Sequence, residues 1–177
     1  MTARKVLVWI VEGTWEGCVD AASQVLAADA EVTLLHVTPA EVAEAAGGAA
    51  AGLLGRGRRP DRDPAARIHA AGRLAAAELL DAAQTRLGRP ASRVALHGRV
   101  ERLVVEAAAD GADLLVVARD GDRSRLGPHS LGPATRFVVD HAACAVLLVW
   151  PAQAPTVDSL PPPPGRPPPP RHRPPPG

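Results

Sequence analysis

The stretch "ADLLVVARDGDRSRLGPHSLGPAT" (residues 112–135) decides the fold class of this chain. It opens with an apolar run at 112–118, passes through a glycine-containing loop, and reaches Gly132 and Pro133, a pair that favours a helix start. A run that is apolar at nearly every position is typical of a strand buried on both faces, as in a parallel sheet. We therefore expect a strand, a loop and a helix in succession, the unit of parallel α/β folds.

This unit repeats along the chain. Four more apolar runs predict strands, at residues 5–11, 31–37, 93–98 and 145–150. Helical patterns lie between the strands, at residues 14–30, 64–88, 100–111 and 132–143. The alternation predicts an α/β fold with a five-stranded, parallel, doubly wound sheet and four main helices.

The two cysteines are interpreted as structural. Cys18 recurs with Ala22, Val25 and Leu26 at helical spacing in the first helix, and Cys144 stands just before the last strand. Two cysteines offer neither a disulfide framework nor a metal-ligand pattern. We expect both thiols to be small apolar packing groups.

Two segments fall outside the repeating pattern. Residues 39–63 predict a short Ala-rich helix and then a loop with Arg56, Arg58, Arg59 and Arg62, which is either a solvated loop or a lid that neutralises phosphates. Thirteen of the 19 prolines lie from Pro151 onward. Such a composition cannot bury a core, so residues 1–151 predict one domain and 152–177 a proline-rich disordered tail, either a spacer or a partner-binding segment.

Bulk properties narrow the function class. The net charge is +1, which gives no argument for nucleic acid as a partner.

The sequence also indicates a cellular location. No apolar run approaches the roughly 18–20 residues that span a bilayer, and no signal-peptide pattern precedes the first strand. We therefore expect a cytoplasmic protein and no membrane partner. P-loop, GxGxxG, CxxC and HExxH motifs are absent, and six scattered histidines form no recognisable catalytic grouping. We predict no catalytic residues, no metal site and no enzyme, with weak ATP hydrolysis left open.

Over residues 5–151 the chain resembles the universal stress protein family. The resemblance is carried by "VLVWIVEGT", "LLHV", "ADLLVVARDG" and "LGPATRFVVDHAACAVLLVWP". It implies strand order 3-2-1-4-5 and a homodimer formed through the edge of the fifth strand. Val146, Leu148 and Trp150 are the candidate dimer contacts, and the alternative is that they simply fill the core.

The resemblance also implies an adenine nucleotide site, which this sequence matches only in part. Nucleotide-binding members show Gly, two residues, Gly, nine residues, and then Gly followed by Ser or Thr. Here Ala118 stands at the first glycine, ten residues separate Gly121 from Gly132, and Pro133 replaces the Ser or Thr. Alanine restricts the backbone, and proline has no N–H to offer a phosphate. The residues that carry over as cofactor-binding candidates are Ile10, Glu12, Val37, Val117, Ala118, Asp120, Gly121, Gly132, Ala134 and Thr135.

Two functions remain open from the sequence. The first is a cytosolic stress-response regulator that binds adenine nucleotide weakly or has lost the site, and acts through homodimer and partner-protein contacts. The alternative is an ATP-binding sensor with an intact nucleotide-gated switch. ATP with Mg²⁺ is the possible cofactor, and Asp122 is the side chain available to help hold the ion.

Overall fold

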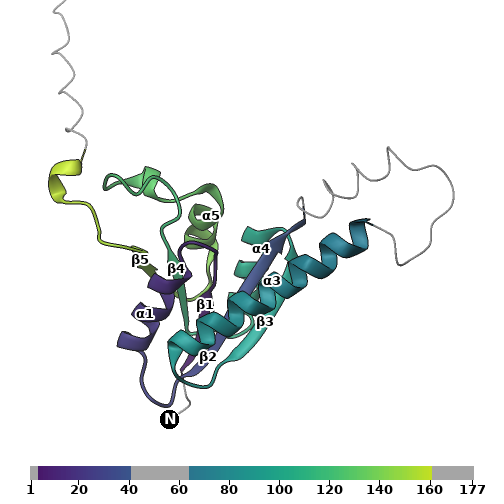
Figure 1. Ribbon diagram of the computed structural model, residues 1–177. Helices are drawn as coiled ribbons and strands as arrows, with labels where there is room; N and C mark the ends of the chain where they lie inside the picture. The colour runs from purple at the N-terminus through teal and green to yellow at the C-terminus, as the bar shows by residue number, and fades with distance from the viewer. Residues whose placement is uncertain (1–3, 41–63, 161–177) are drawn as a thin grey trace, which may run out of the picture.

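The structure is a computed structural model that describes residues 4–40 and 64–160 (Figure 1). Its centre is a parallel sheet of five strands in the order β3-β2-β1-β4-β5, which confirms the predicted fold class and strand order. The strands are β1 (Lys5–Trp9), β2 (Glu31–Pro39), β3 (Ser92–Gly98), β4 (Leu114–Ala118) and β5 (Ala145–Val149).

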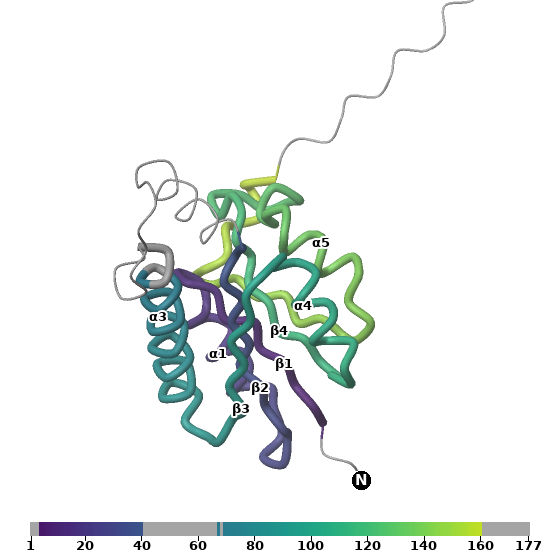
Figure 2. The backbone as a smooth tube through the Cα atoms, turned by 90° about the vertical axis from the view of Figure 1, so that its right-hand side faces the viewer, coloured from purple at the N-terminus to yellow at the C-terminus, as the bar shows by residue number. Residues whose placement is uncertain are grey.

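Helices cover both faces of the sheet, as a doubly wound fold requires. The four helices are α1 (Trp15–Val25), α3 (Pro64–Leu87), α4 (Val100–Ala109) and α5 (Pro133–His141). Helices α1 and α3 pack on one face, and α4 and α5 pack on the other, with the strands between them (Figure 2). Two short 3-10 helices, η2 (Pro128–Ser130) and η3 (Val157–Ser159), follow β4 and β5.

Alternate residues of the central strands fill two separate cores. In β1, Val6 and Val8 face α1 and α3, whereas Leu7 and Trp9 face α4 and α5. All four side chains are at most 5% exposed. Because successive strand side chains point to opposite faces, a strand covered on both sides must be apolar at every position. This explains the uninterrupted apolar runs of the sequence.

Helix α1 corrects one predicted core position. Cys18 and Ala22 are buried as expected, but Val25 is 56% exposed. The helix ends at Val25 because the next residue, Leu26, has an extended backbone (ψ 134°). Burial raises the pKa of the Cys18 thiol to about 12, which agrees with a structural role for this cysteine.

The C-terminal segment folds back onto the domain beyond the predicted boundary at residue 151. The backbone of Pro151 lies against α1, where a Cβ on Gly17 would come within 2.7 Å of Pro151 Cα. Further along, the Leu126 N–H donates a hydrogen bond to Ser159 Oγ (3.0 Å). Described contacts with the domain therefore continue to residue 159, and the remaining tail, 161–177, lies outside the described residues together with the arginine-rich segment 41–63.

Within the described ranges, none of the helices has the length and apolar character needed to cross a membrane.

Candidate functional site

The loop at residues 119–132 joins the carboxyl end of β4 to α5 and closes on itself through its own backbone. The Gly121 N–H donates to Ser130 O (2.9 Å), and the Asp122 N–H donates to His129 O (2.8 Å). A Cβ on Gly121 would lie 2.8 Å from Ser130 C and 2.9 Å from Leu131 C. Real Cβ atoms do not come so close to backbone, so this closure requires glycine at position 121.

Asp120 occupies the N-terminus of α5. The Gly132 N–H donates to Asp120 Oδ1 at 2.7 Å, and both carboxylate oxygens lie 2.9 Å from the position that a Cβ on Gly132 would take. Helix α5 starts at Pro133, which has no N–H. A helix N-terminus attracts anions through its free N–H groups and its dipole. In this structure the anion next to it is the protein's own carboxylate.

Asp122 is engaged within the loop. Its carboxylate accepts hydrogen bonds from Ser124 Oγ (2.6 Å), from the Ser124 N–H (3.0 Å) and from Arg125 Nε (3.0 Å). The Ser124 hydroxyl, with the Ser124 N–H and the Arg125 guanidinium, lowers the pKa of Asp122 below its usual value. Across the described part of the chain, no group of three His, Cys, Asp or Glu side chains is arranged to hold a metal ion.

Arg119 ties the loop to β5. Its guanidinium donates to Ser130 Oγ, and the Ser130 hydroxyl in turn donates to Gly127 O (2.7 Å). Ser130 is fully buried. The guanidinium also lies over the Trp150 ring, 4.8 Å from its centroid, a cation–π arrangement. Arg119 is not among the candidate residues predicted from the sequence, although an arginine that directly follows a buried strand is a signal for it.

The three apolar candidates lie in two different cores. The Ile10 side chain is buried in the core under α1 and α3, whereas Val37 and Val117 are buried in the core under α4 and α5. At the level of the backbone, Ile10 O lies 2.9 Å from His36 Nδ1. These three side chains serve the two cores of the domain.

The other candidate residues lie around the loop with different exposure. Glu12 is exposed in the turn after β1, and Ala118 is buried at the end of β4. Thr135 is buried in the first turn of α5, and Ala134 is half-buried there. Of the ten candidates, the structure directly joins Asp120 and Gly132 by a hydrogen bond and places Gly121 against the backbone that leads to Gly132.

The fifth strand lies at one edge of the sheet and pairs with β4. Val146 and Leu148 are half-buried and pack in the core under α4 and α5. Trp150 is half-buried beneath the Arg119 guanidinium. All three residues predicted as dimer contacts therefore also make contacts within their own chain.

Comparison with protein families identifies the chain. The family model described as the universal stress protein family matches residues 3–149. The chain belongs to the universal stress protein family. Comparison with curated proteins gives no match.

Solved structures of similar fold include other universal stress proteins. The hypothetical protein MJ0577 is 17% identical with a TM-score of 0.65, and the alignment covers 87% of this chain and 100% of that one. The universal stress protein UspA from Lactobacillus plantarum is 20% identical with a TM-score of 0.58, covering 84% and 99%. A universal stress protein in complex with cAMP is 21% identical with a TM-score of 0.55, covering 86% and 100%. At these identities the likeness establishes the fold alone.

Proposed function

We propose that this universal stress protein is a cytoplasmic stress-response regulator whose phosphate-binding position is filled by its own Asp120, and which acts through protein contacts. The observation that carries the proposal is the hydrogen bond from the Gly132 N–H to the Asp120 carboxylate (2.7 Å). A phosphate bound at the start of α5 would use this N–H, and it carries the same sign of charge as the carboxylate that already accepts from it.

The geometry of the rest of the loop supports the same conclusion. The N–H groups of Gly121 and Asp122 donate to carbonyls of the same loop, and Pro133 brings no N–H. A hydrogen bond to a charged group is worth about 1.5–3 kcal/mol. A phosphate that must displace such a bond loses about ten- to a hundredfold in affinity before charge repulsion is counted.

The protein contacts are proposed to include a homodimer at the edge of β5. An edge strand presents unpaired N–H and C=O groups that favour pairing with another chain. Since Val146 and Leu148 pack in their own core, backbone pairing of the strand rather than a fully exposed apolar patch is the proposed source of the interface. Sedimentation equilibrium of the full chain tests this part, because the proposal requires a dimer at micromolar concentration.

The nucleotide part is tested by calorimetric titration with Mg-ATP of the native chain and of the Asp120→Asn/Pro133→Ser variant. The variant removes the internal charge and restores an N–H and a hydroxyl at the start of α5. We expect no saturable binding by the native chain up to about 1 mM Mg-ATP, so that its binding free energy is weaker than about −4 kcal/mol. The variant should bind measurably. An Asp122→Asn/Pro128→Ser variant is the matched control and should behave like the native chain. Micromolar binding by the native chain would refute the proposal.

The second candidate function is an ATP-binding sensor that uses the same loop. The observation that favours it is the solved neighbour in complex with cAMP, which shares the fold. In this alternative, ligand binding displaces Asp120 from Gly132 and the loop rearranges. The same titration separates the two functions, because only the sensor binds Mg-ATP tightly without substitution.

A further inference from the structure

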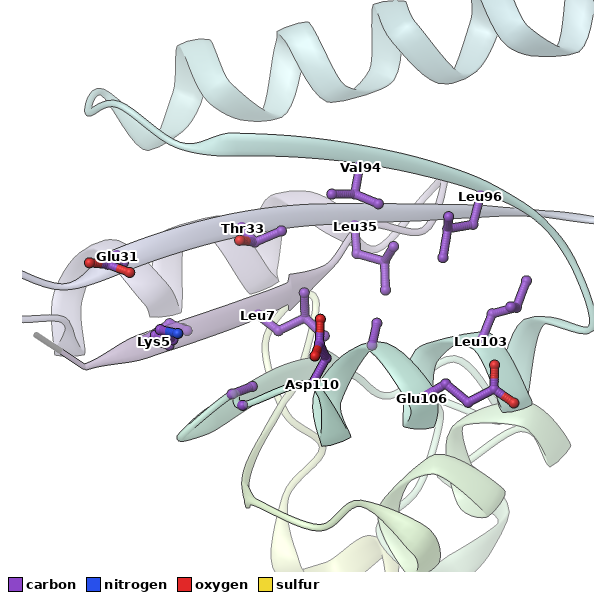
Figure 3. Close-up of a pocket in the computed structure, with 14 residues that line it drawn as sticks. Lys5, Leu7, Glu31, Thr33, Leu35, Val94, Leu96, Leu103, Glu106 and Asp110 are labelled. Carbon is purple, nitrogen blue, oxygen red and sulfur yellow. The ribbon is translucent and has the colours of Figure 1, made fainter.

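A groove with a volume of about 660 Å³ lies between α4 and the sheet, away from the loop at 119–132. Its floor is aliphatic side chains of three neighbouring strands, and its wall is the side of α4 that faces them (Figure 3). The accessible part of the floor and wall is formed by the half-buried side chains of Val94, Leu96 and Leu103, and the buried Leu7 and Leu35 lie beneath it. Lys5 and Glu31 mark the end of the groove at the amino ends of β1 and β2.

The rim of the groove is acidic. The exposed carboxylates of Glu31, Glu106 and Asp110 stand against the single ammonium of Lys5, so the lining charges sum to −2. Figure 3 shows the carboxylates of Glu106 and Asp110 on the side of α4 that faces the strands. Among the ion pairs between described residues, none involves these three carboxylates. An occupant with an apolar body and positive charges is therefore favoured.

The chain itself contains a segment of this chemistry. Residues 161–177 hold eleven prolines, three arginines, one histidine and no acidic residue. Of the two other segments outside the described residues, 41–63 has four arginines and four acidic residues and so no net charge, and 1–3 has no charged side chain. We propose that the proline- and arginine-rich segment 161–177 binds in the groove of its own chain, with Arg171 and Arg173 at the carboxylates of the rim.

Proline suits an aliphatic groove for a physical reason. A buried N–H without a partner is costly, and proline has no N–H to bury. A proline-rich chain therefore lays its rings on the floor without leaving unsatisfied donors. Arginine then adds specificity, because its guanidinium pairs with carboxylates through two parallel hydrogen bonds.

The length of the segment is sufficient. It leaves the described structure at Leu160, beside the loop that follows β4, whereas the groove begins at the amino ends of the strands. Crossing the sheet along β2, which has nine residues, takes about 30 Å. In an extended polyproline conformation the 11 residues from Leu160 to Arg171 reach about 34 Å and the 13 residues to Arg173 reach about 40 Å, so both of these arginines can make the crossing. Exposed ion pairs bind weakly, but a tether of this length supplies a local concentration in the millimolar range.

Carbodiimide cross-linking of the full chain tests the proposal, since Lys5 is the only lysine of the sequence. The Arg171→Lys variant keeps the positive charge and adds one amine to the segment. We expect a cross-link within one chain from position 171 to Glu106 or Asp110, read by peptide mass spectrometry. The matched control is Arg73→Lys, which adds an exposed amine on α3, on the other face of the sheet, and should give no link to these residues.

Hydrogen exchange supplies a second measurement with a full-length chain. In the Arg166→Ala/Arg171→Ala/Arg173→Ala variant we expect the amides at the end of α4 to exchange about twofold faster or more, because a segment bound at least half of the time protects them in the native chain. Unchanged exchange, together with no cross-link from position 171, would overturn the proposal. A cross-link that joins two chains and grows with protein concentration would also overturn it, because the occupant would then be the segment of a second copy.

Discussion

Replacing Asp120 with alanine removes the internal anion from the N-terminus of α5. The variant loses the hydrogen bond from the Gly132 N–H (2.7 Å) and the attraction between the carboxylate and the helix dipole. A negative charge at a helix N-terminus contributes about 1 kcal/mol. In a domain of this size that loss lowers the melting temperature by roughly 3 °C. Calorimetric melting of the two proteins without ligand measures this first effect.

The second effect is a rescue by nucleotide. With the carboxylate gone, the Gly132 N–H is free to bind a phosphate, weakly because Pro133 remains. If Mg-ATP then binds with a dissociation constant of about 1 mM, tenfold that concentration stabilises the variant by about 1.4 kcal/mol, more than the substitution cost. The native chain should gain nothing. The control is Asp122→Ala, which removes a carboxylate that is bonded to Ser124 instead of the helix. Equal stabilisation of all three proteins by Mg-ATP would refute the reasoning.

Further predictions concern two helical glycines and one ion pair. Gly17→Ala should lower the free energy of unfolding by about 1–3 kcal/mol, because the new Cβ would lie 2.7 Å from Pro151 Cα. Gly72→Ala in α3 should raise it by about 0.5–1 kcal/mol, because a Cβ there meets no atom within 4 Å and alanine favours a helix more than glycine does. Urea unfolding of both variants checks the opposite signs. The Arg86 guanidinium, bonded to Asp20 Oδ1 at 2.7 Å, lowers the pKa of Asp20 below 3.8. The stabilisation by this ion pair is therefore present above the pKa of Asp20 in the unfolded chain and is lost as pH falls through its pKa in the folded protein. Asp20→Asn should lower the free energy of unfolding at neutral pH but not near pH 2. An equal loss of stability at the two pH values would contradict the assignment.

The order and number of elements were predictable because the apolar runs are continuous. Strands such as β4 must be apolar on both faces. This pattern can be recognised in the sequence without knowing which elements pack against the strand. Ends of elements were less predictable. Helix α1 stops at Val25 because the chain turns there, and no residue near that point marks a stop as glycine or proline does.

The position of the candidate site in the loop after β4 was predictable, but the contacts between its residues were not. Sequence spacing located Gly121 and Gly132, yet it treated Asp120 as one more residue near a ligand. That Asp120 bonds to Gly132, twelve positions away, depends on how the loop closes through Ser130 and His129. Backbone closure of this kind has no signature in residue type, apart from the glycine that it requires at position 121.

The acidic groove was not predictable either. It combines side chains from three strands and a helix that are distant in sequence, and each of them fits an ordinary position of an amphipathic element. Only the packing of α4 against β1, β2 and β3 shows that they surround one space.

The most direct test of the account follows the amide signals of Gly121, Asp122 and Gly132 by ¹⁵N NMR while the native full-length chain is titrated with Mg-ATP. The account holds that these three N–H groups are already bonded within the protein. It predicts no saturable change in their chemical shifts up to about 1 mM, a ceiling of about −4 kcal/mol. Saturable shifts of the three amides at micromolar nucleotide would contradict it and would show that a phosphate displaces Asp120.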